Sequence, residues 1–342
     1  MIALSLLTLR PGRMGGSEVY ARGLTSALAR VGELEYVCLV APDALGAAGG
    51  LPTRTAGGSA ARNRVAVFGR AALATRAPRG ADVVHYPIMV PLPPSRAPRV
   101  VTLHDVLHLD HPKLVSRATR ARRVVLYDRA VRRADRVIVP SEFTRGRVVA
   151  RLGVDPARIR VVPYGLDHER FRPGPEEREP FLVYPARTWP HKNHRMLFAA
   201  LERVRRTRPD VELVLTGAGL DGPAPDGVRR LGVVDAAEVA SLYRRASALV
   251  FPSLYEGFGW PVIEAMASGC PVAVARGNAA EELAGDAAVL FDPTSEEDVA
   301  AGILRVLDEG PGLVQPGLER AARYTWDGSA RAHEDVYREL LD

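Results

Sequence analysis

The sequence of 342 residues contains only two cysteines, Cys38 and Cys270. Two thiols are too few for a disulfide framework or for a thiolate metal site, so we expect a reducing compartment, the cytoplasm. No stretch approaches about 18 uninterrupted apolar residues, and we therefore expect no membrane-spanning helix. The apolar opening run, residues 1–9, lacks a basic region before it, and we interpret it as a strand rather than a signal peptide.

Aromatic residues are also scarce, at 6% of the chain, and no nucleic-acid recognition module accompanies the net charge of +6. We therefore expect no nucleic-acid partner. The positive charge is concentrated between Lys113 and Arg151, where twelve basic residues stand against three acids. This stretch is typical of a solvated helix surface, and it also fits attraction to a phosphate-bearing acceptor or peripheral contact with the inner face of a membrane.

Hydrophobic residues make up 47% of the chain, enough for full-sized cores. Short apolar runs alternate with amphipathic stretches, a pattern that indicates strand–helix units around parallel sheets. The runs predict strands at residues 2–9, 36–41, 83–86, 100–104, 137–140 and 159–162, and then at 182–184, 211–216, 248–251, 272–275 and 289–291. The stretch 46–64 has no periodicity, and we predict a loop there.

Two α/β domains follow from this pattern. The first is predicted to cover residues 1–163 and the second residues 181–325, joined by a linker at 164–180 that is rich in proline and glutamate. An amphipathic helix, 326–342, is predicted to close the chain.

The most specific pattern is a pair of carboxylates, Glu256 and Glu264. Between them lie Gly257-Phe258-Gly259 and a helix start at Trp260-Pro261, where proline fits because its missing N–H costs nothing in the first turn. The glycines let the backbone approach a ligand and direct amide groups at an anion. Because phosphate oxygens would repel the carboxylates, the hydroxyls of a sugar or ribose are their natural partners. The segment therefore predicts a nucleotide-sugar site.

Two cations, Arg187 and Lys192, follow the predicted strand 182–184. At the carboxyl end of a strand in an open α/β sheet they would lie in the ligand crevice, where they can neutralise a diphosphate leaving group. Taken singly, either residue could instead be an ordinary surface cation. No Asp-x-Asp triplet occurs in the sequence, so we expect neither a metal nor another cofactor.

Three histidines and two aspartates crowd the segment 104–111. His104 and His108 could share a helix face, but Asp105 points elsewhere and Pro112 ends the run, which disfavours zinc. We expect His104 to face a cleft from the carboxyl end of its strand, with a purely structural histidine as the alternative.

Gly15-Gly16 follows the first strand and opens a helix. Such glycines let a phosphate or substrate touch the backbone, although the dinucleotide spacing G-x-G-x-x-G is missing. An ordinary tight turn explains these two glycines equally well.

Together these motifs resemble glycosyltransferase family 4. The segments that carry the resemblance are Gly15-Gly16, His104-Asp105, Pro140 to Phe143, Val162 to Asp167, Arg187 with Lys192-Asn193, Gly217 to Gly219, and Tyr255 to Met266. They cover nearly the whole chain and occur in the family's order. The resemblance implies a GT-B architecture, an α/β fold of two Rossmann-like domains facing across a cleft, with the last helix returning to the first domain.

The resemblance also implies roles for single residues. Glu264 would bind the ribose hydroxyls, Glu256 the transferred sugar, and Arg187 with Lys192 the diphosphate. His104 would contact the sugar from the first domain. The implied catalytic residues are His104, Arg187, Lys192 and Glu256, and the implied donor-binding residues are Gly15, Gly16, Val234, Gly257, Phe258, Gly259 and Glu264.

The implied activity is transfer of a hexose, with retention of configuration, from a nucleotide-diphosphate sugar to a saccharide, a lipid-linked acceptor or a small molecule. GDP-mannose is the favoured donor on resemblance alone. A binding protein that has lost turnover and a nucleotide-sugar epimerase are the alternatives. The sequence departs from the family at Trp260, which could narrow the donor pocket or pack on a strand, and at Glu281, for which we expect no role in the site.

Overall fold

The computed structural model describes residues 1–55, 80–220 and 224–341. The chain forms two compact units, the first made of Met1–Gly165 with Thr325–Asp342 and the second of Leu166–Tyr324. The segment predicted as a linker, 164–180, is divided between the two units after Gly165. The last helix belongs to the first unit, as the resemblance implied.

The first unit is built on a parallel sheet, whose seven described strands run in the order β3-β2-β1-β4-β5-β6-β7. Their bounds are β1 Ile2–Ser5, β2 Tyr36–Val40, β3 Thr53–Thr55, β4 Val83–Tyr86, β5 Arg99–Thr102, β6 Arg136–Val139 and β7 Ile159–Val161. The central strands are buried along their whole length because helices cover both faces of the sheet.

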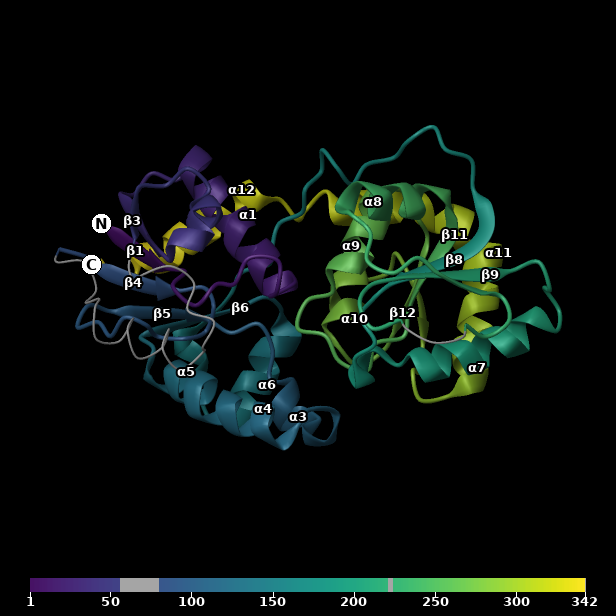
Figure 1. Cartoon of the computed structure of the whole chain (residues 1–342), viewed down its shortest axis with the longest axis horizontal. Helices are drawn as coiled ribbons and strands as arrows, with labels where there is room; N and C mark the ends of the chain where they lie inside the picture. The colour runs from purple at the N-terminus through teal and green to yellow at the C-terminus, as the bar shows by residue number, and fades with distance from the viewer. Residues whose placement is uncertain (56–79, 221–223, 342) are drawn as a thin grey trace. The chain divides into compact units, whose positions relative to one another are not determined.

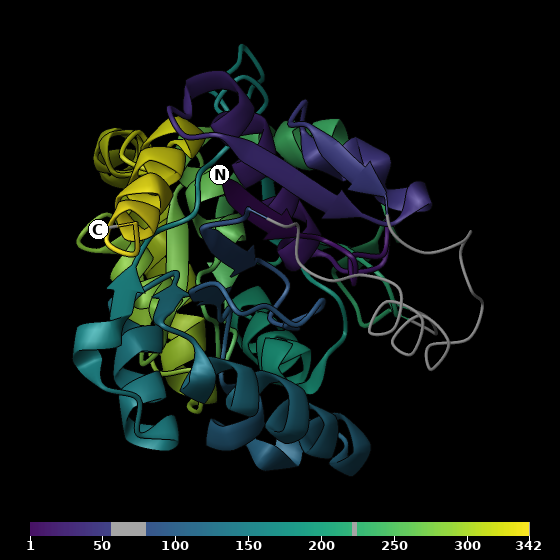
Figure 2. The same cartoon turned by 90° about the vertical axis from the view of Figure 1, so that its left-hand side faces the viewer.

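The helices of this unit lie in two groups. Figure 1 shows α1 and α12 on one side of the sheet and α4, α5 and α6 on the other, and Figure 2 shows the same two layers from the side. The bounds are α1 Gly16–Val31, α3 Leu107–Asp110, α4 Arg117–Arg123, α5 Arg129–Arg133, α6 Glu142–Leu152 and α12 Trp326–Arg338, with a π-helical turn, Val124–Asp128, between α4 and α5.

The second unit is built on a parallel sheet whose six described strands run in the order β10-β9-β8-β11-β12-β13. The strands are β8 Glu179–Pro185, β9 Glu212–Thr216, β10 Val228–Arg230, β11 Ala246–Phe251, β12 Val272–Ala275 and β13 Val289–Phe291. The helices are α7 His194–Arg205, α8 Ala236–Arg245, α9 Trp260–Ala267, α10 Ala279–Ala284 and α11 Glu296–Ala321.

Both sheets have the strand order of a doubly wound fold. The chain starts in the middle, at β1 or β8, builds outward to one edge, and then returns to β4 or β11 to build toward the other edge. In such folds a ligand binds beyond the carboxyl ends of the strands, at the point where the order reverses. The predicted fold class, two Rossmann-like α/β domains, is confirmed.

The structure corrects the prediction at the sheet edges. The stretch 46–64, predicted as a loop, contains the end of a 3-10 helix (Pro42–Ala48) and strand β3, and its residues 56–64 lie outside the described ranges. Strand β10 was not predicted either. Both are three-residue edge strands: β3 is Thr-Arg-Thr, and β10 has one apolar residue, Val228, followed by two arginines. No hydrophobic run therefore reveals them.

No helix within the described ranges is both long enough and apolar enough to cross a membrane.

Helix α12 is anchored to the first unit by a buried carboxylate and by an aromatic ring. The Glu334 carboxylate accepts hydrogen bonds from the backbone N–H groups of Glu33 and Leu34, at 2.7 and 3.0 Å, and from the Tyr36 hydroxyl at 2.5 Å. The Trp326 ring packs so closely on Gly23 that a Cβ there would lie 2.2 Å from it. The helix therefore completes the core of the first unit rather than lying loosely on its surface.

We expect the variant Glu334→Ala to lower the free energy of unfolding of the first unit by about 2–4 kcal/mol, because it leaves the buried N–H and hydroxyl donors without an acceptor. Urea unfolding followed by circular dichroism measures this loss. The matched control is Asp335→Ala on the same helix, where the side chain is 74% exposed. Equal stability of the two variants would contradict the anchoring role of Glu334.

Candidate functional site

The two loops that leave β8 and β11 meet beyond the point where the strand order of the second sheet reverses. Lys192, from the loop after β8, forms an ion pair with Glu256, from the loop after β11, at 2.5 Å between Nζ and Oε1. This pair joins one predicted phosphate-binding cation to one predicted sugar-binding carboxylate. It lies where doubly wound folds bind ligands.

The environment of this pair strengthens the attraction between its partners. The two side chains are only 15% and 14% exposed, and the Lys192 ammonium lies 5.6 Å from the centre of the Phe251 ring. Partial burial strengthens the attraction between the charges, and the aromatic ring adds to it. An ammonium group has three N–H donors, so the pair leaves Lys192 with donors for a second anion.

The loop that carries Lys192 is fixed by its backbone. The Tyr184 hydroxyl donates to the Lys192 carbonyl at 2.9 Å. The next residue, Asn193, has a left-handed backbone with φ of 59°, and its side-chain amide donates to the carbonyls of Pro252 and Pro293 at 3.2 and 2.9 Å. Because Pro252 follows β11, these bonds tie the two loops together and hold Lys192 opposite Glu256.

Arg187 lies in the same loop, exposed to solvent. Its guanidinium carbon lies 5.6 Å from the centre of the Trp189 ring, a cation–π contact with an indole that is itself 53% exposed. An exposed arginine resting on an aromatic ring keeps its donors accessible to a ligand, so Arg187 can bind an oxyanion without a large loss of entropy.

The glycine-flanked helix start forms as predicted. Gly259 is the N-cap of α9 with φ of 111°, a conformation that favours glycine, and Pro261 lies in the first turn. Phe258 is buried and packs edge to face on Trp260, with ring centres 5.6 Å apart. Trp260 therefore contacts the ring of its own loop, whereas packing on a strand or narrowing of a pocket were the predicted alternatives.

Glu264 lies one turn into α9, half-buried, and its Oε2 accepts a hydrogen bond from the Tyr243 hydroxyl at 3.1 Å. Burial raises the pKa of the Glu264 carboxyl to about 7, and neither the Tyr243 bond nor the charge of Arg170 cancels this effect. The carboxyl is thus a group that exchanges its proton near neutral pH.

The remaining predicted donor-binding residue of this unit, Val234, is half-buried in the loop after β10, beside Val233, which is 77% exposed. This loop is connected to the glycine loop after β9, because the Gly217 N–H donates to the Gly232 carbonyl at 2.7 Å. The glycine loop in turn accepts from the Thr188 N–H at 3.2 Å, through Ala218. The loops after three adjacent strands therefore form one connected edge.

The segment 278–281 caps helix α10 and ties it to the loop after β11. The Asn278 side chain caps α10 by accepting from the Ala280 N–H at 2.9 Å, and it donates to the Ser253 carbonyl at 3.0 Å. The Glu281 carboxylate accepts from the Gly277 N–H at 2.7 Å. These bonds shape the loop next to Glu256.

The other predicted site residues belong to the first unit. Gly15 has φ of 55° and precedes α1, whose first residue is Gly16, so the first of these glycines meets a conformational need of the turn. His104 follows β5, the neighbour of β4 in the sheet. Its Nδ1 lies 2.5 Å from the Tyr164 hydroxyl and its Nε2 lies 3.0 Å from the Pro87 carbonyl.

The acidic residues after His104 are occupied by separate cations. Asp105 pairs with Arg123 at 2.7 Å, and Asp110 binds Arg147 and Arg151. His108 is fully buried and contacts Asp128 at 2.9 Å. Within the described ranges, no group of three potential ligands is placed to hold a metal ion.

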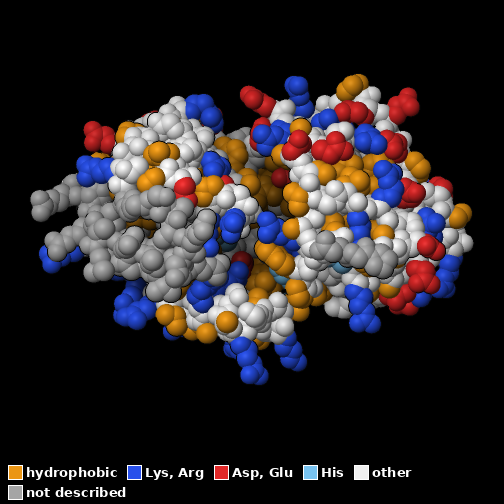
Figure 3. Space-filling model, viewed as in Figure 1, with side chains coloured by type: hydrophobic (Ala, Val, Ile, Leu, Met, Phe, Trp, Pro, Cys, Tyr) orange, Lys and Arg blue, Asp and Glu red, His pale blue; other side chains and the backbone are white. Residues whose placement is uncertain are grey.

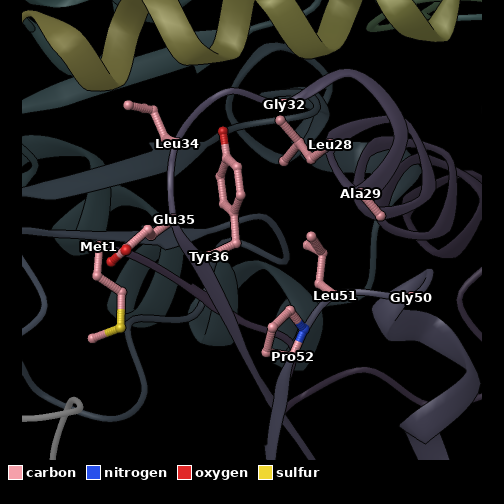
Figure 4. Close-up of a pocket in the computed structure, with 10 residues that line it drawn as sticks. All are labelled: Met1, Leu28, Ala29, Gly32, Leu34, Glu35, Tyr36, Gly50, Leu51 and Pro52. Atoms are coloured by element: carbon pink, nitrogen blue, oxygen red, sulfur yellow. The ribbon is translucent and has the colours of Figure 1, made fainter.

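A cavity of about 430 Å³ lies in the first unit, at the amino ends of its strands and not at the carboxyl ends where His104 and Gly15 lie. Figure 4 shows its lining, which includes Met1, Leu34 and Pro52 at the starts of β1, β2 and β3. Tyr36 also lines the cavity, and its hydroxyl donates to Glu334. We assign no function to this cavity.

Sequence patterns did not reveal three residues that contact the predicted site residues. Tyr243 contacts Glu264, Trp189 contacts Arg187, and the Tyr164 hydroxyl contacts His104. Helical periodicity marks Tyr243 as a buried residue of α8, but it does not tell which carboxylate its hydroxyl reaches. A partner in another loop is set by tertiary packing alone.

Comparison with protein families decides the affiliation. Residues 14–170 match the family described as Glycosyltransferase Family 4, and residues 179–309 match the family described as Glycosyl transferases group 1. The chain belongs to glycosyltransferase family 4.

Two relatives illustrate the similarity in sequence. The chain is 32% identical over 254 residues to D-inositol 3-phosphate glycosyltransferase 2 of Catenulispora acidiphila, covering 64% of this chain and 60% of that protein. It is 29% identical over 271 residues to the MMP alpha-(1->4)-mannosyltransferase of Mycolicibacterium hassiacum, covering 71% of this chain and 66% of that protein. The chain thus spans less than two thirds of the length of these relatives.

Solved structures show the same fold over the whole chain. The sucrose-phosphate synthase of Thermosynechococcus elongatus superposes with a TM-score of 0.79 at 22% identity, covering 99% of this chain and 98% of that one. Anabaena HepE, solved in complex with UDP and glucose, gives a TM-score of 0.73 at 17% identity, with 99% of each chain covered. At these identities the likeness concerns the fold alone, which is that of GT-B glycosyltransferases.

The raised pKa of Glu264 predicts a stability cost for this family 4 protein. The folded carboxyl keeps its proton up to about pH 7, whereas the unfolded one releases it near its ordinary value of 4.5, so stability falls as pH rises between these values. At pH 8 we expect the free energy of unfolding of Glu264→Gln to exceed that of the wild type by about 1–2 kcal/mol, after allowance for solvent screening. At pH 4.5 we expect the two proteins to be equally stable.

Urea unfolding at both pH values tests this expectation. The control is Glu297→Gln on α11, whose side chain is 71% exposed and should not change the pH dependence. A Glu264→Gln variant less stable than the wild type at pH 8 would show that the carboxylate is not strained by burial.

Proposed function

We propose that the chain is a retaining glycosyltransferase that moves a hexose from a nucleotide-diphosphate sugar, with GDP-mannose favoured, to a saccharide, glycolipid or natural-product acceptor. The observation that carries this proposal is the ion pair of Lys192 and Glu256 across the reversal point of the second sheet. It combines a cation for phosphate with a carboxylate for hydroxyls at the position where doubly wound folds bind nucleotides.

In this proposal the donor lies along the connected loop edge of the second unit. The Glu264 carboxylate binds the ribose hydroxyls, and the backbone of Gly257, Phe258 and Gly259 borders the phosphates at the start of α9. Val234 contacts the base. From the first unit, His104 contacts the transferred sugar, and Gly15 and Gly16 border the phosphates and the acceptor.

The diphosphate competes with Glu256 for Lys192. Without donor, Glu256 neutralises the ammonium, and the other N–H donors of Lys192 remain available for a second anion. When a diphosphate binds, Lys192 and Arg187 both pair with it. Glu256 is then partly released and accepts hydrogen bonds from the sugar hydroxyls. The pair therefore holds Lys192 in place before the donor binds, which is the preorganisation that electrostatic catalysis needs.

We propose a front-face substitution for the chemical step. The bond from the anomeric carbon to the phosphate oxygen breaks, the acceptor oxygen bonds to the same face of that carbon, and the departing phosphate takes the acceptor's proton. A double displacement would need a carboxylate free to attack the opposite face. In this proposal Glu256 binds the sugar hydroxyls, so no carboxylate of the site is assigned to such an attack.

The names of the relatives guide the choice of donor. One is called a mannosyltransferase that acts on MMP, and others are D-inositol 3-phosphate glycosyltransferases. The mannosyltransferase name agrees with the preference for GDP-mannose, whereas the D-inositol 3-phosphate names specify no sugar. The Anabaena protein was crystallised in complex with UDP-glucose. Both donors therefore belong in the test.

The test is sugar transfer from GDP-mannose and from UDP-glucose, with a panel of saccharide and lipid acceptors. We expect Lys192→Ala to reduce kcat roughly 100- to 1,000-fold, because one preorganised charge at the leaving group is lost. The matched control is Arg195→Ala, an exposed cation three residues along the chain, which should keep normal turnover. Near-normal turnover of Lys192→Ala would rule out its role.

The same assay separates the alternatives. An epimerase would convert the nucleotide sugar without any acceptor, and a binding protein would bind donor tightly without hydrolysis or transfer. Either result for the wild-type protein would overturn the proposal.

The basic stretch of the first unit fits a membrane-bound acceptor, and we propose peripheral contact of a cytoplasmic protein with the inner membrane face. Arg120, Arg122 and Arg129 are exposed and make no ion pair with any described residue. Val125, in the π-helical turn between α4 and α5, is 62% exposed. Figure 3 shows basic side chains projecting along the lower edge of this unit. Exposed apolar residues among cations suit an anionic bilayer surface.

Co-sedimentation with vesicles that contain an anionic phospholipid tests this contact. Replacement of Arg120, Arg122 and Arg129 by alanine should weaken binding roughly 100-fold at low salt, at about 1 kcal/mol for each charge. The control variant replaces three exposed arginines of the second unit, Arg195, Arg206 and Arg276. Wild-type binding that is absent or independent of salt would count against the membrane contact.

A further inference from the structure

The two hydrogen bonds of the His104 ring determine where its proton lies. The Pro87 carbonyl can only accept a hydrogen bond, so Nε2 must carry the hydrogen of the bond at 3.0 Å. In a neutral ring Nδ1 is then an acceptor, and the Tyr164 hydroxyl donates to it across 2.5 Å. This arrangement specifies the Nε2–H tautomer.

The surroundings of His104 favour the neutral ring. Burial lowers the pKa of His104 to about 4, and although Asp105 and the Pro87 carbonyl raise it, Arg123 lowers it further. His85 faces the same region from β4 and Tyr20 from α1, and the pKa of His85 is itself lowered by burial. At neutral pH the ring therefore has one donor nitrogen and one acceptor nitrogen.

Tyr164 is held firmly in the position from which it donates. Its side chain is buried, and its ring packs on that of Tyr20 with centres 4.6 Å apart. The next residue, Gly165, approaches the start of α12 so closely that a Cβ there would lie 2.3 Å from the backbone nitrogen of Trp326. Neither the ring nor the backbone of Tyr164 can shift without disturbing the core of the first unit.

We propose that Tyr164 is a positioning residue for His104: its hydroxyl commits Nδ1 as an acceptor, so that the ring offers a ligand only a donor, Nε2–H. A ligand oxygen gains this donor by replacing the Pro87 carbonyl. His104 then binds an oxygen of the transferred sugar and does not act as a general base. The part of this inference that concerns the sugar rests on the proposed function.

Nitrogen-15 NMR of the histidine-labelled protein tests the tautomer without any substrate. The His104→Gln variant identifies the signals of His104 among the eight histidines. In the wild type we expect a protonated Nε2 and an unprotonated, hydrogen-bonded Nδ1 at neutral pH. A wild-type ring with its proton on Nδ1 would overturn the inference, even if every variant failed to fold.

The variant Tyr164→Phe keeps the ring and removes the hydroxyl. Because the neutral ring then loses the hydrogen bond at Nδ1 while the Pro87 carbonyl still binds Nε2–H, we expect the tautomer to persist, the Nδ1 signal to shift, and His104 to become protonated at a higher pH than in the wild type. The matched control is Tyr20→Phe, which removes another buried hydroxyl from the same cluster, one that contacts Thr102 and His333 and not His104. Identical His104 spectra for Tyr164→Phe and the wild type would contradict the proposal.

Kinetics add a readout that a merely structural role would not change. We expect Tyr164→Phe to lower kcat about tenfold, as for one ordinary hydrogen bond, with little change in KM, while Tyr20→Phe keeps the kcat of the wild type. A wild-type kcat in Tyr164→Phe, or an equal loss in Tyr20→Phe, would contradict the positioning role. If the wild type transfers no sugar, the proposed function fails, and the spectra alone still decide the tautomer.

Discussion

The reversal of strand order between β8 and β11 is the constraint on which the candidate site depends. Neighbouring parallel strands end at the same edge of a sheet, so the loops that follow them must share that edge, although Lys192 and Glu256 are 64 positions apart in the chain. The attraction between the two charges then determines what the edge can bind. A cation held in place by a carboxylate is ready for phosphate, and the carboxylate is ready for hydroxyls.

Rigid loops make this arrangement useful. Asn193 joins the loop after β8 to the carbonyls of Pro252 and Pro293, and Asn278 joins the start of α10 to Ser253. Amide side chains suit this work because they donate and accept without bringing a charge that would compete with the ligand. The site lowers the stability of the fold at Glu264, because burial disfavours the ionised carboxylate. Functional sites often keep destabilising groups of this kind, although a substitution could make the protein more stable.

The first unit uses buried polar groups for a different purpose. Glu334 and Trp326 fasten α12 to α1 and β2, so the end of the chain completes the core of the unit in which the chain begins. Tyr164 and Gly165 lie beside this anchor, immediately before the chain enters the second unit. The hydrogen bond from Tyr164 to His104 therefore depends on the same packing that holds α12.

The sequence alone determined the class of fold and most of the site's chemistry, because hydrophobic periodicity marks inner strands and because Gly259, Pro261 and the glutamates require particular backbone positions. The edge strands β3 and β10 were not predicted, since each has three residues with at most one apolar side chain among them. Only the tertiary structure decided which groups pair: Lys192 with Glu256, Tyr243 with Glu264, and Tyr164 with His104. Local patterns fix where a side chain starts, whereas its partner is set by strand order and packing across many residues.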